Sequence, residues 1–106
     1  MTFKNKVSIA YQRLTPEEKR LLAFIPDGKE NSMAAKDLEQ FTGLSQRELS
    51  DFSRRLLNKG FPLIACSHGF FKANSYREVA EYKRREQARD LQHAKTVEAC
   101  DKFLNG

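Results

Sequence analysis

The hydrophobic positions between residues 31 and 60 recur at helical spacing in two blocks, which a short turn at 42–44 separates. In this turn Gly43 can take the left-handed conformation that a tight helix exit requires, and Leu44 can point inward between the helices. The pattern predicts a helix that opens at Asn31 or Ser32, a turn, and a second helix that ends near Lys59. The expected inward residues are Ala34, Leu38 and Phe41 in the first helix and Leu49, Phe52 and Leu56 in the second, with Leu57 flanking them.

The start of the second helix is marked by a capping box. Ser45 can accept a hydrogen bond from the backbone of Glu48, whose side chain can reach back to the backbone of Ser45. Leu44 before the cap and Leu49 in the helix have the spacing of a hydrophobic staple. The helix therefore begins at a defined residue, which also fixes the side chains that face outward.

The segment after Gly60 predicts a small β-hairpin. Residues 61–66 form a strand pattern that starts beside a proline, 67–69 a turn, and 70–72 a returning strand. Such a small hairpin is marginal alone, so its apolar face is expected to pack on the helices. Helix, turn, helix and hairpin in this order indicate a winged helix-turn-helix, a mainly α fold with a small two-stranded β-wing.

The first quarter of the chain predicts one or two further helices. Residues 1–14 fit both a helical stripe and strand alternation, and we favour the helix. The run Thr15–Glu18 is a firmer signal, because its first and last residues form a capping box and its proline suits the first helical position. This helix is expected to run to about Ile25, before residues 26–28 stop it.

The C-terminal part predicts one long helix. Ser75 and Glu78 form a third capping box, and no residue that breaks a helix follows until Asn105-Gly106. About 28 helical residues would extend roughly 40 Å, which is longer than a small domain is wide. We therefore expect a winged-helix domain at residues 1–73 and a helical extension at 74–106, whose end projects, pairs subunits in a homodimer or contacts another protein.

Length and composition fit one folded domain without a second, catalytic one. Of the 106 residues, 40% are hydrophobic and 31% are charged, as is usual for a soluble folded protein. No apolar run approaches the roughly 20 residues that span a membrane, and the chain starts without a secretory leader, so we predict a cytoplasmic location. Cys66 and Cys100 are expected to stay reduced and structural.

The net charge of +5 favours nucleic acid or an acidic surface as partner without identifying either. Residues 1–74 hold 12 Lys and Arg against 8 Asp and Glu, hence +4, and residues 75–106 hold 7 against 6, hence +1. The expected winged-helix part therefore carries most of the basic excess.

The polar face of the second helix is the candidate DNA-reading surface. A helix fits the major groove, about 12 Å wide, where arginine can bind guanine and Gln or Asn can bind adenine. Arg55 and Lys59 lie further round the helix and are better placed for phosphates. The alternative is a solvated face on which Asp51 pairs with Arg47 or Arg55. In a DNA complex, Asp51 would accept from a cytosine amino group or hold an arginine. The expected readers are Gln46, Arg47, Ser50, Asp51, Arg54 and Asn58.

Short motifs between residues 14 and 72 resemble those of a known family. They are Lys36-Asp37-Leu38, Thr42-Gly43-Leu44-Ser45, Arg47-Glu48-Leu49, Arg55-Leu56, Gly60-Phe61-Pro62-Leu63 and Gly69-Phe70. Together they are similar to the winged-helix domains of biotin-ligase repressors and, more closely, of small proteins from Gram-positive bacteriophages and integrated elements.

This resemblance implies sequence-preferring binding of double-stranded DNA, in transcription regulation or as a replication accessory, inside a bacterial host cell. It gives residues 46–54 as the reader and residues 68–72 as the wing. His68 and Lys72 therefore join the candidate DNA contacts. His68 could touch a phosphate or cap the turn. The chain departs from the family at Ser53, where such helices often bury an apolar residue, and in a wing tip with little positive charge. No ligase domain follows, so no catalytic role is implied.

The sequence has no signature of an enzyme or a metal site. It contains no phosphate loop, HExxH motif or nucleophile elbow. Cys66 and His68 could begin a zinc site, but the other thiol and imidazole, Cys100 and His93, lie on the distant tail. We therefore expect no catalytic, metal-binding or cofactor-binding residues.

A protein-interaction adaptor without enzymatic activity is the alternative function. It is suggested by the small charge excess, by Asp51 on the reading face and by the uncharged wing tip. In that case the winged helix and the tail would be docking surfaces for another protein.

Overall fold

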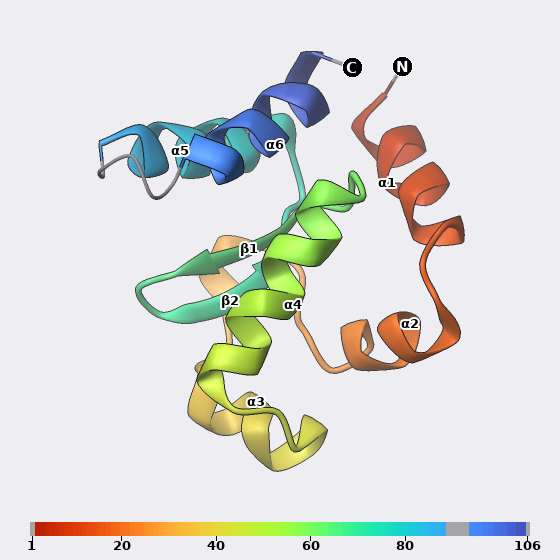
Figure 1. The fold of residues 1–106 in the computed structure, drawn as a ribbon, viewed down its shortest axis with the longest axis vertical. Coiled ribbons are helices and arrows are strands. Elements are labelled where there is room, and N and C mark those ends of the chain that lie inside the picture. Colours follow the sequence, from red (N-terminus) through yellow and green to blue (C-terminus); the bar gives the residue numbers. More distant parts are fainter. Residues whose placement is uncertain (1, 89–93, 106) are drawn as a thin grey trace.

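The computed structural model describes residues 2–88 and 94–105, which form a mainly helical protein with one small antiparallel sheet (Figure 1). The predicted combination of helices with a two-stranded hairpin is therefore confirmed. No helix in these residues is long and apolar enough to cross a membrane. The elements are α1 (Phe3–Gln12), α2 (Pro16–Leu22), the 3₁₀ helix η1 (Lys29–Asn31), α3 (Ala35–Thr42), α4 (Gln46–Asn58), β1 (Leu63–Cys66), β2 (Gly69–Lys72), α5 (Tyr76–Gln87) and α6 (Ala94–Asn105).

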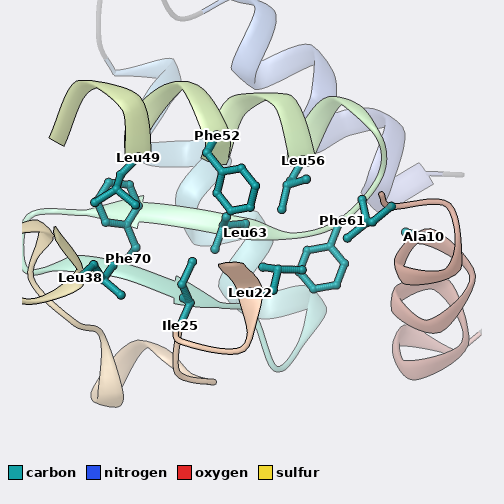
Figure 2. Close-up of a cluster of buried hydrophobic side chains, with 11 residues drawn as sticks. Ala10, Leu22, Ile25, Leu38, Leu49, Phe52, Leu56, Phe61, Leu63 and Phe70 are labelled. Atoms are coloured by element: carbon teal, nitrogen blue, oxygen red, sulfur yellow. The ribbon is translucent and has the colours of Figure 1, made fainter. Parts of the chain in front are cut away.

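The inward face of α4 builds the first of two hydrophobic clusters. Leu49, Phe52 and Leu56 point from α4 toward the hairpin and α2, and each is at most 2% exposed (Figure 2). Leu57, on the edge of this face, is equally buried but belongs to the second cluster. The three inward positions predicted for this helix and the flanking Leu57 are therefore confirmed.

The hairpin lies between the two clusters. Leu63 and Phe70 belong to the first cluster, whereas their neighbours Ile64 and Phe71 belong to the second, which α5 and α6 complete. Successive side chains of a strand point to opposite faces, so each strand supplies both clusters. Because both of its faces are covered, a two-stranded sheet that would be marginal alone is stable.

The second strand also pairs with the chain that precedes α3. Met33 and Phe70 exchange two backbone hydrogen bonds, of 3.0 and 2.9 Å. The N–H of Lys72 donates to the carbonyl of Pro26 at 2.8 Å, and its own carbonyl accepts from Gly28 at 2.9 Å. The loop after α2 is thereby fixed along the outer edge of β2.

The pairing of Met33 with Phe70 places the start of α3 later in the chain than predicted. α3 begins at Ala35, so the predicted start at Asn31 or Ser32 is wrong. Asn31 instead ends the 3₁₀ helix, and Met33 is held in extended pairing with Phe70. The polar residues that resembled a helix cap therefore belong to the loop.

The predicted buried face of this helix is only partly right. Leu38 is fully buried, but Ala34 precedes the helix and is exposed, and Phe41 is 59% exposed. Phe41 stacks instead on Phe24, which follows α2, with ring centroids 6.0 Å apart. Leu38 is therefore the buried residue of α3, and the last turn of the helix carries the exposed Phe41.

The two N-terminal helices agree with prediction except at one boundary. Residues 3–12 form α1, which confirms the helix, and Thr15 and Glu18 form the predicted capping box at the start of α2. α2 ends at Leu22 rather than near Ile25, although Ile25 is buried at 3% exposure. The hairpin likewise starts later than predicted, at Leu63, and Gly69 belongs to its second strand.

The predicted long C-terminal helix is wrong. α5 ends at Gln87 and α6 begins at Ala94, and the two helices pack on each other (Figure 1). Val79 of α5 and Cys100 of α6 are fully buried in the second cluster. Two shorter helices can bury both of these thin apolar stripes against the hairpin, whereas one straight helix would leave the second stripe in water.

Only half of the third predicted capping box forms. The Ser75 hydroxyl accepts from the N–H of Glu78, but the Glu78 carboxylate accepts from the N–H groups of Asn74 and Lys29. The glutamate therefore joins the start of α5 to the loop before α3.

Candidate nucleic-acid interface

The N-terminus of α4 is fixed by local hydrogen bonds. The Ser45 hydroxyl accepts from the N–H of Glu48 at 3.2 Å, and the Ser45 N–H donates to the Glu48 carboxylate at 3.0 Å, which confirms the capping box. These bonds from Ser45 hold the pKa of Glu48 below its ordinary value. Gly43 has a φ of 74°, the left-handed conformation expected at the exit from α3. The side chains that follow the cap are therefore held in a defined orientation.

Ser53 ties the buried side of α4 to the hairpin. Its hydroxyl donates to the carbonyl of Leu63 at 3.1 Å, and the residue is only 3% exposed. The position of Ser53 faces the start of β1, where a hydroxyl finds a carbonyl to bind. A serine rather than an apolar residue at this buried site therefore has a structural explanation within the fold.

The opposite side of α4 is polar and open to solvent. Arg47, Asp51, Arg54 and Asn58 are all exposed there, and Ser50 is half-buried at the edge nearest the hairpin. The Arg54 guanidinium lies 3.7 Å from the Asp51 carboxylate, and 63% of each side chain is exposed. Such a surface pair contributes little to stability. Gln46 is exposed at the tip of the helix.

Arg55 and Lys59, which were predicted to bind phosphates, have a partner inside the protein. The Glu18 carboxylate, with a side chain 5% exposed, accepts from Arg55 Nε at 3.2 Å and from Lys59 Nζ at 2.9 Å. Its pKa is raised by burial but lowered more by the hydrogen bonds from the Thr15 backbone, Lys59 and Arg55, so that the net shift is downward. These two cations join α4 to α2.

The two candidate residues of the wing lie at opposite ends of the hairpin. His68 is exposed in the turn, next to Ser67, and the turn contains no lysine or arginine. Lys72 pairs with Leu63 in the sheet, at the end away from the turn, and its ammonium lies 3.9 Å from Asp27. The structure therefore does not bring Lys72 to the turn of the hairpin.

The surface beside α4 includes residues of α6, which the sequence predicts to project away from the domain. A polar cavity of about 190 Å³ is lined by Ser50 and Arg54 of α4, by Ser67 of the hairpin turn and by Thr96 of α6. Asn58 lines a second groove together with the exposed Lys95. Because a single projecting helix was predicted, no sequence signal placed α6 next to the reading face.

The two cysteines are free, and they form no recognisable metal site. Burial, with the carboxylates of Glu86 and Asp101 nearby, raises the pKa of the Cys100 thiol to about 11, so this thiol stays protonated at neutral pH. No cluster of three or more His, Cys, Asp or Glu suited to a metal occurs within residues 2–88 and 94–105. His93, considered above as a possible ligand, lies outside these residues.

Comparison of the chain with protein-family models, with curated proteins and with solved structures finds no match. The resemblance to the winged-helix proteins of Gram-positive bacteriophages therefore stays a prediction from short motifs.

Proposed function

We propose that the protein binds double-stranded DNA with α4 in the major groove and prefers particular sequences. One observation carries the proposal. α4 is a 13-residue helix whose start is capped and whose apolar half is fully buried, while its other half presents Arg47, Asp51, Arg54 and Asn58 to solvent. A rigid helix with exposed hydrogen-bonding side chains is what direct reading of base edges requires.

The side chains on this face suit different bases. Arg47 and Arg54 can each bind the O6 and N7 atoms of guanine, and Gln46 or Asn58 can bind the N6 and N7 atoms of adenine. Asp51 could accept from a cytosine amino group, but its contact with Arg54 favours the role of holding that arginine in position. Arg55 and Lys59 already bind Glu18, so the proposed reader consists of Gln46, Arg47, Ser50, Asp51, Arg54 and Asn58.

Such a protein would act by occupying a DNA site or by recruiting another protein to it, without a chemical step. On the resemblance to phage and mobile-element proteins, the site would be an operator or a replication origin, in the cytoplasm of a bacterial host. The polar face of α4 supports DNA binding itself, and the choice between transcription and replication comes from the resemblance alone.

Arg47→Ala and Arg54→Ala are each expected to weaken binding to a duplex selected from a random pool, by about 1–3 kcal/mol, because each removes a base contact. Fluorescence anisotropy on the selected duplex measures the loss, with thermal unfolding as the check that each variant is folded. Arg77→Ala is the matched control, since this α5 side chain is 86% exposed and pairs with Glu81 of its own helix. If both α4 variants bind like the control, the assignment of the reader helix is wrong.

A protein-interaction adaptor is the second candidate, and one observation favours it. The stacked side chains Phe24 and Phe41 are 43% and 59% exposed, which is unusual for two adjacent phenylalanines. A partner that covers them would bury apolar surface beside α3. Titration of the protein with random duplex DNA at low salt separates the two functions, because the adaptor predicts no detectable binding.

A further inference from the structure

α6 lies along one flank of the proposed reading helix. Figure 1 shows it next to the C-terminal half of α4, and the two helices are in contact. Thr96 lines one cavity with Arg54 of α4, and Lys95 lines the neighbouring groove with Asn58. The first turns of α6 therefore border the same surface that α4 presents to solvent.

The outward side of α6 carries two lysines and one carboxylate. Lys95, Glu98 and Lys102 follow each other at helical spacing and are exposed. The one carboxylate among them, Glu98, lies 3.9 Å from Lys102, with 69% and 78% of the two side chains exposed, so solvent screens this pair strongly. Asp101, the other carboxylate of α6, binds Lys83 of α5. The exposed row of Lys95, Glu98 and Lys102 thus carries a net charge of +1 beside the polar face of α4.

The basic surface continues onto the end of α1. A notch of about 290 Å³ is lined by Lys102 together with Lys6, Arg13 and Lys59, and no carboxylate takes part in its lining. Two of these cations have internal partners: Lys6 donates to the carbonyl of Phe103 at 2.6 Å, and Lys59 binds Glu18. By contrast, the hairpin turn that was expected to act as the wing carries no lysine or arginine.

The spacing between α4 and α6 can be compared with the width of the major groove. Packed helices have axes about 8–10 Å apart, and the major groove is about 12 Å wide. When one helix lies in the groove, a helix packed beside it therefore lies over the rim, where the phosphates are. Lys102 follows Lys95 by seven residues, or about 10 Å along the helix, so the two ammonium groups can reach different phosphates of the backbone.

We infer that α6 is a second DNA-contacting element, in which Lys95 and Lys102 bind phosphates on one side of the groove that α4 reads. This inference rests on the proposed function and deepens it, because it assigns the non-specific part of the binding to α6 instead of the wing. An acidic protein segment could also be attracted to these lysines. The duplex is favoured because the lysines border the polar face of α4, which offers hydrogen bonds but little apolar surface.

The double substitution Lys95→Gln and Lys102→Gln in the full chain is expected to remove two phosphate contacts. Each contact contributes about 0.9 to the slope of log affinity against log salt, so affinity should fall about eightfold per contact at about 0.1 M salt. The slope should become less steep by about 1.8. The double substitution Lys29→Gln and Arg77→Gln is the matched control, since it removes the same charge from the network around Glu81, away from α4.

Titration of a fluorescent duplex across a range of salt concentrations gives both quantities. If the α6 variant retains the slope and affinity of the control while Arg47→Ala weakens binding, the inference about α6 is overturned and the proposed function stands. If the wild-type chain binds no duplex at low salt, both are overturned. A fall in affinity that is similar for selected and random duplexes supports α6 as a phosphate-binding element.

Discussion

Gly69→Ala is expected to lower the free energy of unfolding by about 3–5 kcal/mol, a large part of the stability of a small domain. Gly69 opens β2 with a φ of 134°, a conformation that L residues rarely adopt. A Cβ atom there would lie 1.9 Å from the carbonyl oxygen of Met33 and 2.8 Å from the Cα of Ala34. Both obstacles are backbone atoms, and the pairing of Met33 with Phe70 holds that backbone in place.

Gly43→Ala is the control that separates the two causes. Gly43 also has a positive φ, of 74°, but a Cβ atom there would meet nothing within 4 Å. This variant should therefore suffer only the conformational cost, about 1–2 kcal/mol. Urea unfolding followed by circular dichroism compares the two variants. A Gly69→Ala protein no less stable than Gly43→Ala would show that the hairpin and the loop before α3 do not approach so closely.

The features that could be predicted from the sequence are those with local causes. The capping boxes at Ser45 and Thr15 and the glycine exit at Gly43 need only residues within one or two turns, and all three form as expected. The exposed face of α4 was equally predictable, because the positions of Leu49 and Phe52 on the helix determine which side chains face away from the core.

The features that could not be predicted depend on contacts between distant segments. No residue between Ser75 and Asn105 is a strong helix breaker, yet the helices α5 and α6 are separate, because together they bury Val79 and Cys100 in one cluster. Likewise, pairing with Phe70 rather than local capping decides where α3 begins. Tertiary burial outweighs local helix propensity in both places.

In the candidate site, too, local features can be predicted from the sequence and contacts between distant segments cannot. Exposure of Arg47 and Arg54 follows from the helical pattern, whereas the pairing of Arg55 with Glu18 joins residues 37 positions apart in the sequence. A helical wheel shows that Arg55 lies on the outer side of α4 but gives no information on the element packed beside it. For the same reason the sequence does not predict the proximity of Lys95 to α4.

Glu18→Gln is expected to lower the free energy of unfolding by about 1–3 kcal/mol. The Glu18 carboxylate is nearly inaccessible to water and binds three groups: the backbone N–H of Thr15, Arg55 and Lys59. Glutamine can still accept from Thr15, but it loses the charge that attracts the two cations and places an amide donor near them. The expected loss of unfolding free energy is moderate because Arg55 and Lys59 are themselves partly exposed and can turn to solvent.

Glu17→Gln is the matched control, since Glu17 lies in the same first turn of α2 and is exposed. Both substitutions remove one negative charge from the N-terminus of the same helix, so any effect of the helix dipole is shared. Urea unfolding at neutral pH should show the larger loss for Glu18→Gln. Equal losses in the two variants would mean that the contacts of Glu18 with α4 do not stabilise the fold.

The stability difference between wild type and Glu18→Gln should also depend on pH. The pKa of Glu18 in the folded protein lies below the ordinary value of 4.5, because the hydrogen bonds from Thr15, Lys59 and Arg55 outweigh the effect of burial. A carboxyl group whose pKa is lowered by folding stabilises the folded state while it is ionised, so its contribution is complete above the ordinary pKa and is lost as the pH falls through the folded pKa. The two proteins should therefore differ by a constant amount near neutral pH and converge as the pH falls below 4.5. A difference that persists unchanged into this acidic range would show that packing of the side chain, and not its charge, joins α2 to α4.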